Sequence, residues 1–291
     1  MNLHSILSPI DFSEQSRLAL RWAGAFATRF NARLTVASVV DPVLAEASRI
    51  RSGRDRVKAE TEAALREFVA ATWREGAPAQ TAFITTVGDA PTAIREMAEA
   101  HGAELIAMGT HGLGGLRKWL LGSTTERVLR RTRVPVLALP PSDGSQAGAA
   151  GRVSHLLAAT DFSDASVEAL KVAAEWAREF GAAMTVAHVV EPLAVAAQWQ
   201  ALVDDSTQVR VDSARARLRA LAQVVCGAPC EDVVAIGETA EAIAAIAADR
   251  RAQMIVMSLG GGAGALSPRP GSIAYRVLRL SPIPVLVVPG A

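Results

Sequence analysis

The sequence contains little cysteine and no long uninterrupted apolar segment. Its two cysteines, Cys226 and Cys230, are too few for a disulfide framework, and no second Cys/His pair stands nearby to complete a metal site. We therefore interpret the stretch between them as a turn that leads into a strand. The most apolar window, residues 181–203, is broken by polar side chains, so it cannot form a membrane span of about 20 residues.

A strong net charge of either sign is also lacking. The formal net charge of +1 gives no general attraction to nucleic acid or to anionic membranes, so we expect neither as a partner. The first residues show neither the basic segment nor the apolar run of a secretory signal, which predicts a cytoplasmic protein whose thiols stay reduced. Charge is nevertheless uneven: residues 1–140 carry 18 basic and 14 acidic side chains, whereas residues 141–291 carry 12 and 15. The first half is therefore the better host for an anion.

The chain repeats itself once, with a period as long as a domain. Asp11-Phe12-Ser13 returns 150 residues later as Asp161-Phe162-Ser163. Val39-Val40-Asp41-Pro42 returns at the same offset as Val189-Val190-Glu191-Pro192, and later motifs return at an offset of 149. This pattern indicates a duplicated domain rather than a solenoid of short repeats.

A linker separates the two copies. Residues 141–151 have no apolar periodicity and are rich in Pro, Gly and Ser, which is typical of a flexible connection. We therefore expect one domain over residues 1–140 and a second over residues 152–291.

Short apolar segments alternate with longer amphipathic ones in each half, which predicts buried parallel strands connected by helices. In the first half the expected strands are 4–9, 33–40, 80–86, 104–108 and 134–139, and the expected helices are 14–30, 44–74, 90–101 and 123–131. Ser13 is a suitable N-cap for the first helix. Alternation of this kind implies right-handed crossovers, so the predicted fold class is α/β with a doubly wound parallel sheet in each half.

A glycine-rich segment follows the fourth predicted strand, with the spacing Gly109-x2-Gly112-x9-Gly122-Ser123. Glycines let backbone N–H groups approach a ligand without a clash at Cβ, and a helix starting at Ser123 would offer unpaired N–H groups to a phosphate. The hydroxyls of Ser123 and Thr124 could bind phosphate oxygens or Mg²⁺. The spacing is neither that of a P-loop nor that of the dinucleotide motif. On the loop alone, a phosphate site and a merely tight strand-to-helix connection are equally good interpretations.

Side chains that follow other strands would join this loop at one edge of the sheet. In open α/β sheets, ligands bind beyond the carboxyl ends of the strands, where the strand order reverses. Asp11 follows the first strand and could accept a hydrogen bond from a ribose hydroxyl or an adenine amino group, or it could instead cap the helix after Ser13. Val39 ends the second strand and could line a base pocket, although a core position is its default interpretation.

These motifs together resemble the universal stress protein family. The resemblance rests on Asp-Phe-Ser, Val-Val-Asp/Glu-Pro, Gly-x2-Gly-x9-Gly-Ser and the final Val-Pro-Val-Leu, and it covers the chain twice apart from the linker. It implies an adenine-nucleotide-binding, Rossmann-like domain with a five-stranded parallel sheet of order 3-2-1-4-5, and ATP as ligand, often with a divalent metal such as Mg²⁺. By this resemblance the residues around adenine, ribose and phosphates would be Pro9, Asp11, Val39, Met108, Gly109, Gly112, Gly122, Ser123 and Thr124.

The second half departs from the family pattern. Ser258 replaces the first glycine, and Leu266 and Ser267 stand where the first half has Arg117 and Lys118. A Cβ on Ser258 would crowd the backbone where close approach is required. The positions that retain the motif are Asp161, Val189, Gly261, Gly271 and Ser272. We therefore expect a second nucleotide site that is weaker than the first.

Features of an efficient enzyme are lacking in the sequence. There is no evident nucleophile–base pair or adenylyl-transfer motif, and His111 in the glycine-rich loop has no evident orienting partner. Three functions stay open: an ATP-binding module of a stress response, a slow ATPase at the same site, and an interaction protein with vestigial sites. The intact first loop argues against the third, and the missing base argues against the second.

The last strand of each half is expected to lie at a sheet edge. Pro135 and Pro284 lack the N–H group that a central strand requires, and a long apolar edge needs a cover. We expect the strands 134–139 and 283–288 to meet about a pseudo-two-fold axis, which would make the chain an intramolecular pseudo-dimer. Association into a homodimer stays open.

Overall fold

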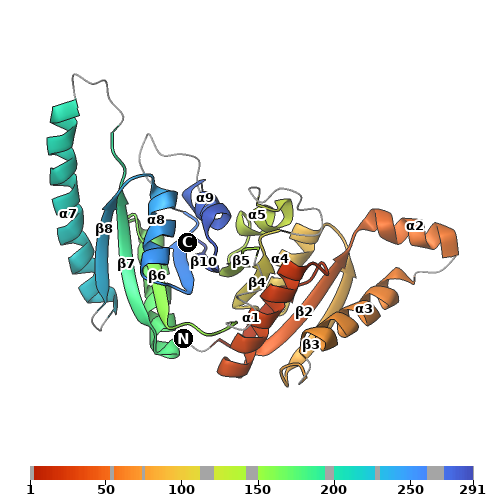
Figure 1. Cartoon of the computed structure of the whole chain (residues 1–291). Coiled ribbons are helices and arrows are strands. Elements are labelled where there is room, and N and C mark those ends of the chain that lie inside the picture. The colour runs from red at the N-terminus through yellow and green to blue at the C-terminus, as the bar shows by residue number, and fades with distance from the viewer. Residues whose placement is uncertain are drawn as a thin grey trace. The chain divides into compact units, whose positions relative to one another are not determined.

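The computed structural model describes residues 3–52, 56–73, 76–111, 121–141, 150–193, 200–226, 230–260 and 272–290. The chain divides into two compact units, Asn2–Arg152 and Val153–Ala291. Each unit contains five parallel strands with helices on both sides of them, and each unit is described by itself (Figure 1).

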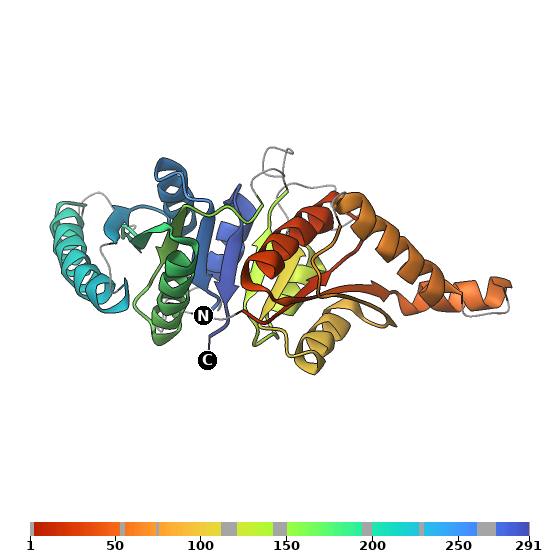
Figure 2. The ribbon, with the colours of Figure 1, turned by 90° about the horizontal axis from the view of Figure 1, so that it is seen from below.

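The first unit is a doubly wound α/β domain. Its elements are β1 (Ser5–Pro9), α1 (Glu14–Phe30), β2 (Arg33–Val40), α2 (Pro42–Ser52), α3 (Val57–Thr72), β3 (Thr81–Val87), α4 (Ala90–Ala100), β4 (Leu105–Gly109), α5 (Ser123–Leu129) and β5 (Val136–Leu139). The strands are parallel and follow the order β3-β2-β1-β4-β5, which confirms the predicted order 3-2-1-4-5. Helices α1 and α3 cover one face of this sheet and α4 covers the other (Figure 2).

The core of the first unit lies between α1 and the central strands. All five residues of β1 are buried, and Trp22 and Phe26 of α1 pack on the sheet with 2% and 0% of their surface exposed. The apolar residues of α1 recur at helical spacing on the side that faces β1 and β4. A rigid sheet with this packing fixes the positions of the loops at its carboxyl edge.

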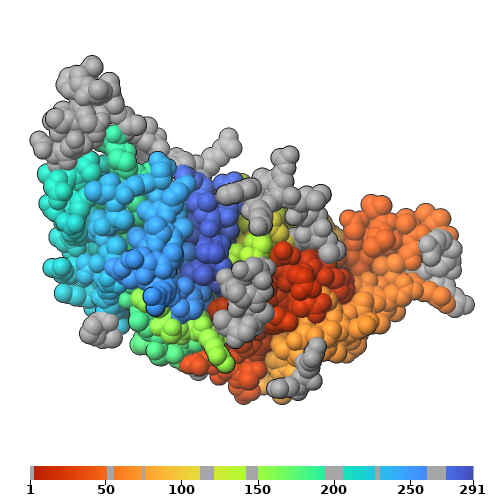
Figure 3. Space-filling model, in the orientation of Figure 1, coloured from red at the N-terminus to blue at the C-terminus, as the bar shows by residue number. Residues whose placement is uncertain are grey.

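The predicted helix over 44–74 is wrong in one respect, because the structure has two helices there, α2 and α3. The sequence between them includes Gly53, and glycine is a poor helix former. Helix α2 extends away from the sheet of the first unit, as Figures 1 and 3 show, and its Val43 and Ile50 are 78% and 77% exposed. Residues 42–50 of α2 are therefore mostly exposed and bury little apolar surface.

The second unit repeats the architecture. Its elements are β6 (His155–Ala159), α6 (Asp164–Phe180), β7 (Ala183–Val190), α7 (Gln200–Cys226), β8 (Glu231–Ile236), α8 (Thr239–Asp249), β9 (Met254–Ser258), α9 (Ser272–Leu280) and β10 (Val285–Val288). The parallel strands follow the order β8-β7-β6-β9-β10, which is the same order as in the first unit. One long helix, α7, stands where the first unit has α2 and α3.

The two cysteines differ from expectation, since the structure joins Cys226 and Cys230 in a disulfide. Helix α7 runs as far as Cys226, and Cys230 directly precedes β8, so their Cα atoms lie 6.5 Å apart. That separation is within the range that a disulfide can span. No helix in the described part of the chain is both long and apolar enough to cross a membrane.

Candidate functional site

The candidate site of the first unit lies where the strand order reverses. Strand β1 pairs with β2 on one side, with Pro9 opposite Ala37, and with β4 on the other, with Leu7 opposite Ile106. The loops after β1, β2 and β4 therefore leave the sheet side by side, at the carboxyl ends of these strands, as expected if the strands are neighbours. This edge brings together Asp11, Val39 and Gly109, at the position where open α/β sheets bind ligands.

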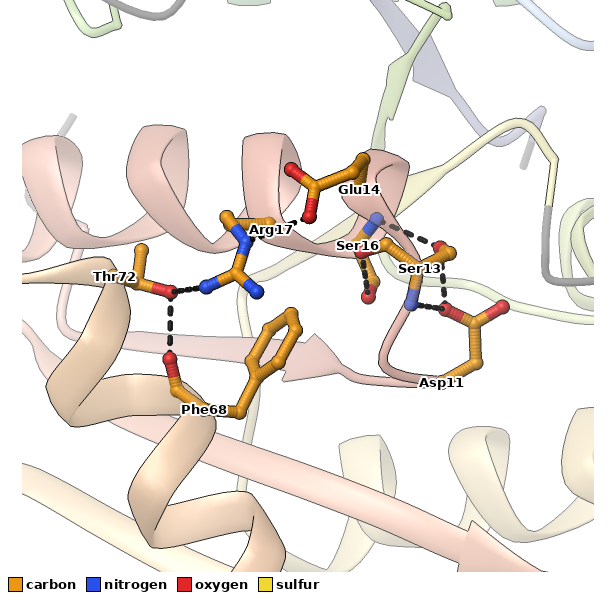
Figure 4. A network of polar contacts seen from close by, with 7 residues as sticks. All are labelled: Asp11, Ser13, Glu14, Ser16, Arg17, Phe68 and Thr72. Carbon is orange, nitrogen blue, oxygen red and sulfur yellow. Dashed lines mark hydrogen bonds and ion pairs between the residues drawn. The ribbon is translucent and has the colours of Figure 1, made fainter.

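Asp11 holds the turn between β1 and α1 (Figure 4). Its Oδ1 accepts hydrogen bonds from the backbone N–H of Ser13 at 3.1 Å and from the Ser13 hydroxyl at 2.6 Å. Ser13 is the N-cap of α1 and accepts from the N–H of Ser16 at 3.1 Å, as predicted. Phe12 between them has a φ of 67°, in the left-handed region that a bulky residue rarely adopts. Asp11 thus supports the N-cap Ser13 and is not itself the cap, and its side chain is exposed at the carboxyl end of the sheet.

An aromatic and cationic layer fixes α3 against this turn. The ring of Phe68 in α3 meets the ring of Phe12 edge-on at 5.6 Å, and the Arg17 guanidinium lies 4.1 Å from the Phe68 ring centre. Arg17 also donates to Thr72 Oγ1 at 3.0 Å and to Glu14 at 3.1 Å, as Figure 4 shows. Sequence reasoning missed these residues. The Glu14–Arg17 spacing of one helical turn is visible in the sequence, but the contact with α3 is not.

The predicted base-pocket residues differ in exposure. Val39 is half-buried, whereas its neighbours in β2 from Leu34 to Ser38 are buried. Pro9 and Met108 are buried in β1 and β4, and Met108 is only 5% exposed. Of these three predicted residues, Val39 is therefore the one whose side chain reaches solvent at the edge.

Glycine at position 109 is required by the packing of α1, whether or not a ligand binds there. A Cβ atom at this position would lie 2.8 Å from Cβ and 3.1 Å from the carbonyl carbon of Gln15 in α1. Glycine therefore lets the first turn of α1 approach the end of β4. Ser258, its counterpart in the second unit, carries a Cβ and donates its hydroxyl to the carbonyl of Gly260 at 2.6 Å.

The start of α5 is attached to the end of β4. The N–H of Gly122 donates to the carbonyl of Thr110 at 2.8 Å, and Thr125 Oγ1 donates to the carbonyl of Gly109 at 2.8 Å. The Gly122 N–H is thus already paired and is not offered to a phosphate. Ser123 is exposed and Thr124 is half-buried at this helix start, so their hydroxyls lie at the same edge as the end of β4.

His111 is buried at the beginning of the segment that connects β4 to α5. It is 9% exposed, and its Nδ1 lies 2.9 Å from Thr110 Oγ1. This placement agrees with a role in the structure of the loop. Seven predicted or discussed loop residues lie outside the described residues: Gly112, Arg117, Lys118, Gly261, Leu266, Ser267 and Gly271.

The second unit repeats the acidic turn. Asp161 Oδ1 accepts from the N–H of Ser163 at 3.0 Å and from its hydroxyl at 2.5 Å. Burial raises the pKa of Asp161, but the hydrogen bonds from Ser163 and Ser166 outweigh it, so the pKa is lowered and the carboxylate is ionised. Val189 is half-buried like its counterpart, and Ser272 is the first residue of α9.

A cationic and imidazole cluster distinguishes the second unit. The His188 ring lies 4.4 Å from the Phe162 ring, and His188 Nδ1 lies 2.8 Å from the Thr160 carbonyl oxygen. The Arg217 guanidinium from α7 lies 4.4 Å from the centre of the same Phe162 ring. Burial lowers the pKa of His188, only partly offset by the Thr160 carbonyl, which keeps the imidazole neutral. The two candidate sites are thus similar in backbone and different in side chains.

The fold belongs to the class of Rossmann-like α/β domains with an open, doubly wound sheet. The family model of the universal stress protein family matches residues 2–140 and 153–289. The chain therefore belongs to the universal stress protein family, with two of its domains in tandem.

Similar proteins agree with this assignment. A universal stress protein of Methanocaldococcus jannaschii is 29% identical over 150 residues, which are 46% of this chain and 93% of that protein. One from Thermus aquaticus is 33% identical over 134 residues, covering 46% of this chain and 96% of that protein. The crystal structure of a universal stress protein from Archaeoglobus fulgidus matches 99% of both chains with a TM-score of 0.66 at 22% identity, which supports the tandem fold. Another solved universal stress protein, 24% identical over 48% of this chain with a TM-score of 0.36, is described as a complex with cAMP.

Proposed function

We propose that this protein is a nucleotide-dependent stress-response or regulatory module that binds ATP in its first half. The observation that carries the proposal is the meeting of Asp11, Val39 and the end of β4 at the reversal of strand order. Open α/β sheets bind nucleotides at this position, beyond the carboxyl ends of the strands.

Each residue at the edge has a chemical task in this proposal. Asp11 uses one carboxylate oxygen for the turn, so its other oxygen accepts from a ribose hydroxyl or the adenine amino group. Val39 provides an apolar wall for the base. The hydroxyls of Ser123 and Thr124 hold phosphate oxygens, together with backbone groups of the Gly109–Gly112 segment. Mg²⁺, where it accompanies the nucleotide, neutralises phosphate charge.

The first half is the stronger site in this proposal. It carries a net charge of +4 over residues 1–140, against −3 over residues 141–291, which favours a polyanion. Gly109 is replaced by Ser258 in the second half, and the Cβ of Ser258 crowds the backbone where a ligand must approach closely. We therefore assign the second half weaker nucleotide binding.

A binding role is better supported than a catalytic one. A general base must lie within reach of the proton that it removes. His111 is buried and contacts Thr110, so its imidazole is not presented to a water molecule at the edge. Regulation through the bound state of the nucleotide requires no such base.

Calorimetric titration of the full chain with ATP tests the proposal. Asp11→Asn preserves the size of the side chain and an oxygen that can accept from Ser13, but it replaces the second carboxylate oxygen by a donor. We expect this change to weaken ATP binding by about tenfold or more, because a charged acceptor is lost. The matched variant Asp161→Asn is expected to leave the tighter binding event unchanged.

Three outcomes would contradict the proposal. The first is absence of binding heat with ATP in excess, and the second is equal effects of the two variants. The third is rapid release of phosphate during the titration, because it would show an ATPase rather than a binding module. Repeating the titration with a chelator separates the contribution of Mg²⁺ from that of the protein.

A further inference from the structure

The two cysteines of the chain form a bond at one specific junction of the second unit. Cys226 is the last residue of α7, and Cys230 directly precedes the edge strand β8. The disulfide closes a loop with a sequence separation of four residues. It therefore connects the end of the long helix to the start of the outermost strand.

The fold itself does not require this bond. At the same junction of the first unit, between α3 and β3, hydrogen bonds connect the chain. The Thr81 hydroxyl donates to the Pro78 carbonyl at 2.7 Å, and the Gly76 N–H donates to the Trp73 carbonyl at 3.1 Å. The second unit thus has a connection that depends on oxidation where the first unit has one that does not.

Both cysteines are held by anchored elements. Glu231, the residue after Cys230, pairs with Arg250 through two contacts of 2.7 and 2.6 Å and accepts from Thr185 at 3.1 Å. Cys226 ends a helix that packs on β7 and β8. Because both neighbours are fixed, the two sulfur atoms stay within bonding reach, which favours ring closure over reaction with other thiols.

The two sulfur atoms differ in access to solvent. Cys226 is buried, with 7% of its surface exposed, whereas Cys230 is partly exposed. An external reagent therefore reaches Cys230 first. Cys226 is in position to react with Cys230 afterwards.

We propose that Cys226 and Cys230 form a redox-modification site that takes a low-molecular-weight disulfide as its oxidant. The Cys230 thiolate attacks the external disulfide, forming a mixed disulfide and releasing one thiolate. The Cys226 thiolate then attacks the Cys230 sulfur, forming the protein disulfide and releasing the second thiolate. The protein loses two electrons and two protons, and the oxidant is reduced to two thiols. Excess thiol reverses both steps.

The structural consequence is local. The closed ring is short, so it restricts the unfolded chain little compared with a long-range disulfide. Oxidation fixes the end of α7 to the start of β8, which pairs only with β7 in its own unit. We expect slower amide exchange around Cys226 and Glu231 in the oxidised protein, by roughly tenfold, with little change in the first unit.

Thiol trapping of the full chain tests the site without any nucleotide. The protein is equilibrated with oxidised or reduced glutathione, quenched with N-ethylmaleimide, and weighed intact by mass spectrometry. We expect two maleimide groups per chain after reduced glutathione and none after oxidised glutathione, since the chain has two cysteines. Thiols that stay open to maleimide under oxidised glutathione would overturn the proposal. So would a bond that resists excess reduced glutathione, because it would then be a permanent cross-link.

Single variants test the order of the two steps. Cys226→Ser leaves the exposed thiol, so we expect a stable glutathione adduct on Cys230. Cys230→Ser leaves the buried thiol, and its adduct should form roughly tenfold more slowly because access limits the attack. Equal rates would overturn the assigned order. Circular dichroism checks that both variants fold. If either variant does not fold, the thiol trapping of the chain without substitutions decides whether Cys226 and Cys230 form a redox-modification site.

Discussion

Gly109 and Gln15 meet at a point where the structure leaves no room for a side chain on Gly109. A Cβ atom there would lie 2.8 Å from the Gln15 Cβ, closer than real Cβ contacts. We expect Gly109→Ala to lower the free energy of unfolding of the first unit by about 1–3 kcal/mol, since the first turn of α1 must move. Urea denaturation of the full chain measures the effect.

Gly88 provides the control for this prediction. A Cβ atom at Gly88 would lie 3.8 Å from the Ala93 Cβ, an ordinary contact distance. Gly88→Ala should therefore be nearly neutral. Equal losses in the two variants would mean that glycine flexibility, rather than the contact with α1, decides the cost at Gly109.

Arg17 connects α1 to α3 through Phe68 and Thr72. Its side chain is only 22% exposed, so removal loses packing as well as a hydrogen bond. We expect Arg17→Ala to destabilise the first unit by about 1 kcal/mol. Arg66→Ala is the comparison, because Arg66 also lies over a ring, at 4.5 Å from Phe83, but is 57% exposed. A cost for Arg66→Ala as large as that for Arg17→Ala would contradict the importance of burial here.

Local sequence patterns were sufficient to predict the strands and the N-cap Ser13, whereas the strand order came from the family resemblance. Short buried strands and capping motifs depend on neighbouring residues, so they are visible in a single sequence. The contacts of Gly109 with Gln15 and of Arg17 with Thr72 depend on tertiary packing and were not predictable. The disulfide was also missed, because spacing alone does not reveal that α7 and β8 bring both cysteines within reach. Sequence reasoning therefore predicted the fold better than the tertiary contacts that hold individual residues in place.

Acid should weaken the second unit through His188. Burial lowers the pKa of His188 below its ordinary value of 6.5, with Asp161 opposing and Arg217 and Arg210 adding to the shift. The unfolded chain then binds a proton more readily than the folded chain, so stability falls as pH drops through and below about 6.5. We expect His188→Gln to flatten the dependence of unfolding free energy on pH between about 7 and 5. At about pH 8 the imidazole is neutral in both states, which makes that pH the internal reference. An unchanged slope in the variant would exclude His188 as the source.

Ser123 should distinguish phosphates from the nucleoside. It is exposed at the start of α5, and α5 is attached to the end of β4 through Thr125. We expect Ser123→Ala to weaken ATP binding by about fivefold, the loss of one hydrogen bond, and to leave adenosine binding unchanged. The matched variant is Ser272→Ala at the start of α9, which should have little effect on the tighter of the two ATP-binding events. Equal losses for ATP and adenosine would show that Ser123 acts on the fold and not on the phosphates.

The last strand of each unit gives the final prediction, which concerns assembly. Strand β5 pairs with β4 and strand β10 pairs with β9, each on one side of the strand within its own unit. Both strands are apolar, and an apolar edge tends to associate with another edge. We expect isolated residues 1–140 to self-associate in analytical ultracentrifugation, because they lack the second half as a cover. A strictly monomeric first half at high concentration would contradict an intramolecular pseudo-dimer built on these strands.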